Sequence, residues 1–133
     1  MPSRRVLVLD DDAQVRRALA RMLRSWDVTD VGTAAEAVAR IEAGDDFGVL
    51  LIDQSLRWPC PRGLELCASV QQRFPVLSDR LVLLTGGLQE SEWAEARRLG
   101  VTVMMKPPSL KELRELVSSR CDGAAPEGQT ATG

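Results

Sequence analysis

The sequence predicts an α/β domain built on a five-stranded parallel sheet that is doubly wound, with helices on both faces. Two observations support this prediction. Four short runs are nearly continuous in Val, Leu and Ile instead of alternating with polar residues, which is typical of strands buried on both faces. Amphipathic helical segments fall between these runs, and right-handed crossovers then place helices on both sides of the sheet.

Four apolar runs are expected to be strands of the sheet, and a fifth run is expected to be an edge strand. The four runs consist of valine, leucine and isoleucine almost throughout, with methionine closing the last of them. The fifth run is weaker in its β-type pattern. The four runs comprise residues 6–9, 48–52, 81–84 and 101–105, and the weaker run comprises residues 27–31.

The helices are predicted from apolar stripes and from capping signals. Residues 13–24 place apolar side chains on one stripe at helical spacing, and residues 63–74 do the same. Capping boxes begin helices at Thr33 and Ser109, each followed three residues later by a glutamate. Residues 89–99 end at Gly100, a typical helix stop. Five strand–helix pairs in this order predict a flavodoxin-like (βα)5 fold.

Length and composition limit the classes of function. The 133 residues suit one domain, which we place at residues 1–120, and we expect residues 121–133 to be a disordered tail or linker. The net charge of −2 predicts no direct binding to nucleic acid, and no apolar run approaches the ~18 residues of a membrane span. The three cysteines form no C-x-x-C pair, which indicates a reducing, cytoplasmic setting, and we expect no Cys60–Cys67 bridge.

The chain contains no histidine and no tyrosine. This absence excludes a Ser-His-Asp triad, a histidine-ligated zinc and a histidine that acts as general base or phosphocarrier. Any acid–base or nucleophilic chemistry must therefore come from aspartate, glutamate, lysine, cysteine, serine or threonine.

Chemically active side chains follow four of the predicted strands, at the edge where open α/β sheets bind ligands. The strands ending near residues 9, 52, 84 and 105 are followed by Asp10, Asp11 and Asp12, by Asp53, by Thr85, and by Lys106. Carboxylates this close repel one another unless a cation neutralises them, and a hard ion such as Mg²⁺ meets that need. An aspartate can attack phosphorus, while Mg²⁺, a lysine and a hydroxyl stabilise the transferring group.

Each of these residues also has an ordinary structural explanation. Asp12 is expected to be a helix N-cap rather than a ligand, and an aspartate after a strand is often only a turn residue. Thr85 alone would be a strand end, and Lys106 alone would be surface charge. Because four separate strand ends carry complementary chemistry, the set as a whole favours a phosphoryl-transfer site.

These residues resemble the pattern of a response-regulator receiver domain, the phosphoacceptor of two-component signalling. The resemblance covers about residues 4–120 and rests on segments 6–11, 50–53, 81–86 and 106–107. It implies that Asp53 is the phosphorylated aspartate, and that the acidic pair Asp10 and Asp11 serves the magnesium site. Asp11, Asp53 and the backbone carbonyl of Ser55 would bind Mg²⁺ directly. Thr85 would hydrogen-bond the phosphoryl group, and Lys106 would pair with another of its oxygens.

The resemblance also implies the partners. The phosphoryl donor would be a histidine of a sensor histidine kinase or of a phosphohistidine relay protein. The domain would assist its own phosphorylation and dephosphorylation without being a turnover enzyme. An output partner or output domain is expected, and a homodimer is compatible with the family.

Three departures from the family pattern stand out. The loop from Asp53 to Gly63 spans ten residues instead of eight, and Arg57 replaces its usual proline. The switch aromatic expected three residues before the lysine is Val103, so no ring can turn inward when Thr85 moves toward the phosphate. Pro108 follows the Lys-Pro pair in place of the common phenylalanine. Trp58 and Trp93 are candidates to replace the aromatic, although a packing role is the simpler interpretation of both.

Two alternatives remain at the level of sequence. A pseudo-receiver would keep the fold and bind partners without taking up phosphate, and Val103 and the altered loop keep this interpretation open. A phosphatase of the haloacid-dehalogenase type would use residues 10–12 as its D-x-D motif. That interpretation leaves Asp53 unexplained and lacks an acidic pair after Lys106.

Overall fold

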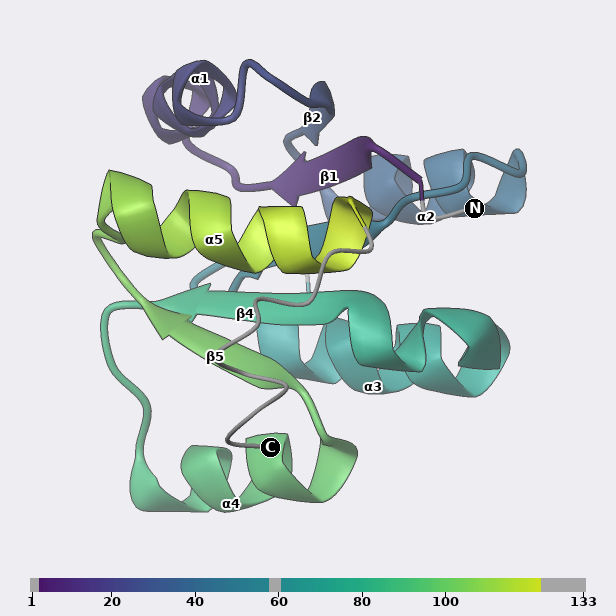
Figure 1. The fold of residues 1–133 in the computed structure, drawn as a ribbon. Helices are drawn as coiled ribbons and strands as arrows, with labels where there is room; N and C mark the ends of the chain where they lie inside the picture. The colour runs from purple at the N-terminus through teal and green to yellow at the C-terminus, as the bar shows by residue number, and fades with distance from the viewer. Residues whose placement is uncertain (1–2, 58–60, 123–133) are drawn as a thin grey trace, which may run out of the picture.

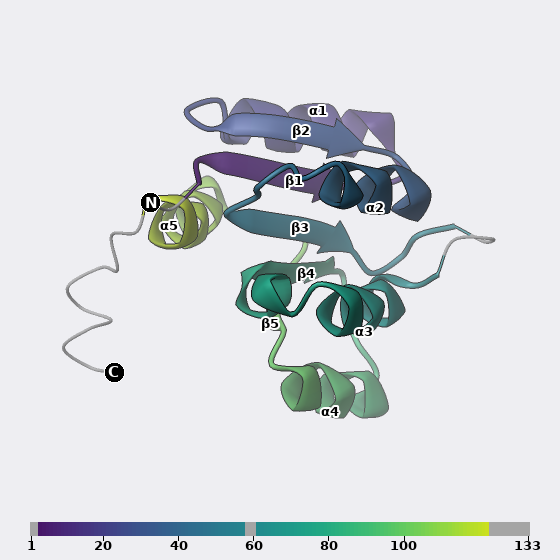
Figure 2. The same cartoon turned by 90° about the vertical axis from the view of Figure 1, so that its right-hand side faces the viewer.

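Five parallel strands form one sheet in the order β2-β1-β3-β4-β5, as Figures 1 and 2 show. The computed structural model describes residues 3–57 and 61–122. Each strand pairs in parallel with its neighbours. The strands are β1 (Arg5–Leu9), β2 (Asp27–Val31), β3 (Val49–Asp53), β4 (Leu81–Thr85) and β5 (Thr102–Met105). This order confirms the predicted doubly wound, flavodoxin-like fold, with β2 at an edge as expected.

An α-helix follows each strand, and the helices cover both faces of the sheet. They are α1 (Ala13–Met22), α2 (Ala34–Glu42), α3 (Gly63–Arg73), α4 (Glu90–Leu99) and α5 (Leu110–Cys121). Helices α1 and α5 cover one face, and α2, α3 and α4 cover the other. A 3₁₀ helix, η1 (Pro75–Arg80), precedes β4 and was not predicted.

Strands β1, β3 and β4 form the buried centre of the sheet. Successive residues of β1 point to opposite faces, so Val6 and Val8 contact the α1/α5 side while Leu7 and Leu9 contact the other. Every residue of β3 and β4 is buried. The nearly continuous apolar runs were therefore correctly interpreted as strands covered by helices on both faces.

Strand β5 differs from this expectation, because it is only partly covered. Its first three residues are half-buried, and the Met105 side chain is 47% exposed. The reason is its position at the edge of the sheet, where it pairs with β4 alone. The apolar stripe predicted for residues 13–24 is also only partly buried. Leu19 and Leu23 are buried, whereas Ala18 is exposed.

The helix ends confirm the capping predictions. The Asp12 carboxylate accepts the Gln14 and Val15 N–H groups at the start of α1. Thr33 and Ser109 cap α2 and α5 in the same way, each accepting a backbone N–H from the glutamate three residues later. Gly100 ends α4 with a left-handed φ of 71°, a conformation that glycine adopts without strain.

The C-terminal helix extends beyond residue 120, the expected end of the domain. Helix α5 continues through Cys121, whose side chain is 1% exposed, and Asp122 caps the helix. Asp122 also accepts a hydrogen bond from the Trp26 indole and pairs with Arg4. These contacts fold the first two residues of the expected tail into the domain. The rest of that segment lies outside the described residues, as do Trp58 and Cys60, whereas Cys67 is a free, buried thiol.

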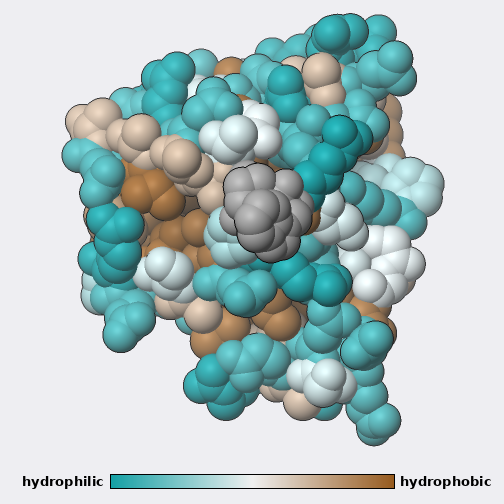
Figure 3. Space-filling model, turned by 180° about the vertical axis from the view of Figure 1, so that it is seen from behind, coloured by the Kyte–Doolittle hydropathy of each residue, from teal (hydrophilic) through white to brown (hydrophobic). Residues whose placement is uncertain are grey.

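On the face shown in Figure 3, hydrophilic side chains predominate and apolar side chains gather in a few patches. Within the described ranges, the large apolar side chains that are well exposed are Val76, Met105 and Leu110. No helix in the same ranges combines the length and the apolar character needed to cross a membrane.

Candidate functional site

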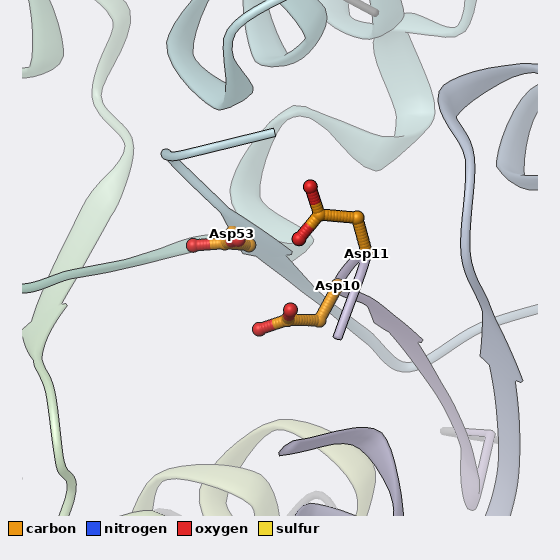
Figure 4. A group of neighbouring side chains, drawn as sticks. All are labelled: Asp10, Asp11 and Asp53. Carbon is orange, nitrogen blue, oxygen red and sulfur yellow. The ribbon is translucent and has the colours of Figure 1, made fainter. Parts of the chain in front are cut away.

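Three carboxylates meet at the carboxyl ends of the two central strands β1 and β3. Asp10 and Asp11 follow β1, and Asp53 is the last residue of β3. One carboxylate oxygen from each residue lies within 4.8 Å of the others, and Figure 4 shows the side chains converging. Asp10 and Asp53 are almost completely buried, so their charges need compensation close by.

Lys106 supplies part of that compensation. Its Nζ lies 2.8 Å from Asp53 Oδ1 and 3.1 Å from Asp10 Oδ2. The backbone amide of Lys106 donates to the Thr85 carbonyl and so continues the pairing of β5 with β4. This bond places the lysine at the same sheet edge as the carboxylates. Burial lowers the pKa of Lys106, but the hydrogen bonds to Asp53 and Asp10 outweigh this and hold the pKa above its ordinary value. The lysine is therefore cationic at neutral pH.

Backbone groups and one arginine orient the buried carboxylates. The Ser55 amide donates to Asp53 Oδ1 over 3.2 Å, and the Asp12 amide donates to Asp10 Oδ1 over 2.9 Å. Arg16, on the second turn of α1, donates from Nη1 to the Asp10 carbonyl oxygen at 2.6 Å. Its Nε also pairs with Asp30 after passing Gly32, where the lack of a side chain leaves room. The two aspartates are thus held by several independent contacts.

Arg57 is the second cation at the cluster. Both its backbone amide, at 3.0 Å, and its guanidinium Nε, at 3.3 Å, face Asp11 Oδ2. The guanidinium side chain is 81% exposed, so this pair is strongly screened by water. The sequence showed Arg57 only as a departure from a proline, because 46 residues separate it from Asp11.

Thr85 ends β4 and is buried, but its hydroxyl does not contact the carboxylates. Thr85 Oγ1 donates to the Gly87 carbonyl oxygen at 2.9 Å and accepts the Gly87 amide at 3.0 Å. The structure therefore brings Asp10, Asp11, Asp53 and Lys106 into contact, and it leaves Thr85 at the same sheet edge with its hydroxyl turned to the following loop. Ser55 is exposed beside Asp53, and the role of its carbonyl as a metal ligand stays a prediction.

Gln54 is a buried polar residue that the sequence interpretation missed. Its side chain is 1% exposed and hydrogen-bonds both α3 and α4. The available signal was a long polar side chain directly after a fully apolar strand, since such a residue must find partners if it is buried.

The donor set at the cluster fits a hard divalent cation. Three carboxylates outnumber the one lysine that contacts them from inside the site, and all the candidate ligand atoms are oxygens. Mg²⁺ prefers carboxylate oxygen and water ligands, and it would neutralise the remaining negative charge. The geometry thus offers a nucleophilic carboxylate, a cation site and a lysine within a few ångströms of each other.

Comparison with known proteins identifies the family. A sequence model described as the response regulator receiver domain matches residues 6–118, which is most of the chain. The chain belongs to the receiver domain family. Receiver domains are signalling domains of two-component systems and not enzymes in the ordinary sense. No curated protein sequence matches the chain.

Solved structures of receiver domains share the fold. A CheY-like receiver domain protein from Methanospirillum hungatei JF-1 is 23% identical, with a TM-score of 0.78 over 98% of this chain and 99% of that one. The receiver domain of the Francisella response regulator 1452 is 21% identical, with a TM-score of 0.77 over 92% and 98%. The chemotaxis protein CheY4 of Vibrio cholerae is 20% identical, with a TM-score of 0.76 over 90% and 99%.

Two further positions that depart from the receiver pattern, Val103 and Pro108, lie within the described residues, as does one of the two tryptophans considered as replacements for the switch aromatic. Val103 is partly buried on the sheet face covered by α2, α3 and α4. Trp93, on α4, is half-buried, and Trp58 lies outside the described residues. Pro108 is half-buried at the start of the turn into α5.

Proposed function

We propose that Asp53 accepts a phosphoryl group from a histidine of a sensor histidine kinase or a phosphohistidine relay protein, with Mg²⁺ bound beside it. The observation that carries this proposal is the contact of Lys106 with Asp53 inside a cluster of three carboxylates. A structural ion pair needs one carboxylate for one lysine, whereas this cluster gathers excess negative charge around a nucleophile.

The chain's own residues supply most of the transfer step. Asp53 Oδ1 already accepts hydrogen bonds from Lys106 and Ser55, so we expect Oδ2 to attack phosphorus. An O–P bond forms as the N–P bond of the phosphohistidine breaks, and the imidazole leaves with the electron pair and takes a proton from solvent. Lys106 then shifts its ammonium toward a phosphoryl oxygen, and Thr85 turns its hydroxyl from Gly87 to another.

Mg²⁺ would be held by Asp10, Asp11 and Asp53 and by the Ser55 carbonyl. When bound, it supplies positive charge to the phosphoryl oxygens in the transition state. Asp10 and Arg16 would keep the site rigid, because the Arg16 hydrogen bond fixes the peptide that leads into Asp11.

The phosphatase alternative meets a specific difficulty. A D-x-D motif needs the first and third aspartates to face the reacting group together. The Asp12 carboxylate instead accepts two backbone N–H groups at the start of α1. A pseudo-receiver remains a second candidate, favoured by Val103 in place of the switch aromatic.

We further propose a cytoplasmic location and an output partner or domain outside these residues, with a homodimer as one form of output. We also propose that the chain does not bind nucleic acid directly, because its net charge is −2 and several basic side chains pair with acidic ones, as Arg73 does with Glu42 and Arg98 with Glu95.

Binding of beryllofluoride, an acyl-phosphate mimic, tests the proposal. We expect Mg²⁺-dependent binding by the wild type, with altered fluorescence from Trp58, which stands five residues after Asp53 in the sequence. A small phosphodonor such as acetyl phosphate should label the wild type and leave Asp53→Asn unlabelled, as intact-mass spectrometry would show. Thr85→Ala should be labelled more slowly.

The outcomes separate the alternatives. Binding of neither Mg²⁺ nor beryllofluoride, with no label on Asp53, would favour the pseudo-receiver. Continued turnover of phosphomonoesters by the Asp53→Asn variant would favour the phosphatase.

A further inference from the structure

Gln54 joins three elements of the fold at the residue next to Asp53. Its amide donates to the Leu84 carbonyl of β4, and its own carbonyl accepts the Gly63 amide at the start of α3. Its side-chain Oε1 accepts the Leu64 amide at 2.7 Å, and its Nε2 donates to Glu92 Oε2 at 2.9 Å. Because Gln54 is only 1% exposed, its polar atoms depend on these protein hydrogen bonds.

Glu92, the partner on α4, is itself held in place. Its Oε1 accepts the Gln89 amide at 2.8 Å, and its Oε2 lies 3.4 Å from the Arg62 guanidinium. The pKa of Glu92 lies below its ordinary value, mainly because the Gln89 N–H stabilises the carboxylate, with Gln54 and Arg62 adding to the effect. The bond from Gln54 is therefore a charge-assisted one at neutral pH, and it ends on the first turn of α4.

Helix α4 has few other attachments. Ala96 is its one fully buried residue, and Figure 2 shows the helix at the β5 end of the molecule, beyond α3. At its other end, Gln71 of α3 donates to the Leu99 carbonyl oxygen at 2.8 Å. A cavity of about 400 Å³ lies beside the Gln54–Glu92 contact, lined on α3 by Leu64 and Ala68 and on α4 by Ser91 and Glu95.

The surroundings of Gln54 are tight on one side and open on the other. A methyl group at Gly63 would collide with the Asp53 carbonyl oxygen and lie 2.8 Å from the Gln54 Cα, so the end of β3 and the start of α3 leave no free space between their backbones. The cavity, by contrast, leaves space beside Glu92 for α4 to shift. The Gln54–Glu92 hydrogen bond is thus a direct connection between the peptide next to Asp53 and the first turn of α4.

We propose that Gln54 is a positioning residue that couples phosphorylation of Asp53 to the first turn of α4 through its bond to Glu92. This inference rests on the proposed function, because it needs a charge change at Asp53. The coupling would run through a buried hydrogen bond. In this chain β5 carries Val103 at the position where the family has its switch aromatic. A phosphoryl group on Asp53 adds negative charge and accepts hydrogen bonds from the donors that orient the Asp53 carboxylate. The peptide between Asp53 and Gln54 moves as these hydrogen bonds rearrange.

Amide chemical shifts measured before and after addition of Mg²⁺ and beryllofluoride test the coupling. In the wild type we expect shifts at Ser55 and Lys106, which report occupancy of the site, and at residues 91–96 of α4. In Gln54→Leu the site shifts persist, and the α4 shifts fall to less than half. Gln71→Leu is the matched control, because it removes the contact at the far end of α4 and should leave the α4 response to beryllofluoride intact.

Variants at Glu92 reach the same bond from the surface. Glu92→Ala should reproduce the Gln54→Leu result even if the buried leucine perturbs folding. Glu92→Gln keeps an oxygen acceptor for Gln54 and should restore much of the α4 response. A role of Gln54 in stability alone would instead make Gln71→Leu and Gln54→Leu weaken the response equally.

The failures are distinguishable. If the α4 shifts in Gln54→Leu and Glu92→Ala match the wild type while Ser55 and Lys106 respond, the coupling inference is overturned and the proposed function stands. If Ser55 and Lys106 do not respond in the wild type, the proposed function is overturned and the inference with it.

Discussion

The charge balance at the carboxylate cluster depends on single residues, and Lys106 is the most important of them. It contacts two carboxylates that are almost fully buried, while its own side chain is 27% exposed. Because the pKa of Lys106 is raised in the folded protein, its contribution to stability is fully present below its ordinary pKa. That contribution is lost only as the pH rises through the raised value.

Replacing Lys106 by alanine should lower the free energy of unfolding by about 1–3 kcal/mol at neutral pH, since two buried carboxylates lose their partner. Millimolar Mg²⁺ should recover more stability in this variant than in the wild type, because it replaces the missing charge. Urea unfolding with and without Mg²⁺ measures both effects. Equal Mg²⁺ stabilisation of the two proteins would contradict the charge argument.

Arg57 would compete with a metal ion for Asp11, because its guanidinium Nε lies 3.3 Å from Asp11 Oδ2. Because the side chain is exposed, the pair is weak, and Arg57→Ala should raise the Mg²⁺ affinity only about two- to fivefold. Isothermal titration at low salt measures the change, which should shrink as the salt concentration rises. Arg62→Ala removes a charge from the same loop, where Arg62 pairs with Glu92, and should change the affinity less. Equal effects of the two variants would show that only net charge matters.

At the scale of elements, the junction of β3 and α3 is the tightest near the site. A side chain at Gly63 would collide with backbone atoms of Asp53 and Gln54, which cannot yield as a flexible side chain would. Gly63→Ala should therefore destabilise the protein by about 2–3 kcal/mol in urea unfolding. Gly86, at the end of β4, has no atom within 4 Å of an added methyl group, so Gly86→Ala should stay within about 0.5 kcal/mol of the wild type. A tolerated Gly63→Ala would show that β3 can move toward α3.

Helices and strands were predictable to the extent that their signals are local. The capping residues Asp12, Thr33 and Ser109 contact amides two or three positions away, and the structure confirms all three. The buried centre of the sheet followed from apolar runs. The partial exposure of β5 did not, because its residues resemble those of the central strands and only the strand order places them at an edge.

For the molecule as a whole, the last turn of α5 ties the end of the domain to its beginning. Cys121 lies against the Arg5 carbonyl in the core, and Asp122 contacts Arg4 and Trp26. A chain ending at Arg120 should therefore be about 2–4 kcal/mol less stable than a chain ending at Asp122. Urea unfolding of the two chains makes the comparison. Equal stability would show that residues 121 and 122 add nothing to the stability of the domain.

The fold class and the chemical character of the site edge follow from local patterns in the chain. Apolar runs, capping boxes and polar strand ends are local patterns, and a parallel sheet necessarily gathers its strand ends at one edge. The receiver resemblance drawn from Asp10, Asp11, Asp53, Thr85 and Lys106 is confirmed at the level of the family, while their individual roles remain proposals.

Which side chains meet depends on the three-dimensional packing of the chain. Gln54 bonds Glu92 across 38 residues, and Arg57 meets Asp11 across 46. Such pairs depend on how α3, α4 and the long loop settle on the sheet, and no periodicity in the chain encodes that arrangement. The carboxylate site could be predicted because the strand ends of a parallel sheet converge by topology. The Gln54–Glu92 bond to α4 could not, because contacts between helices and loops depend on packing in three dimensions.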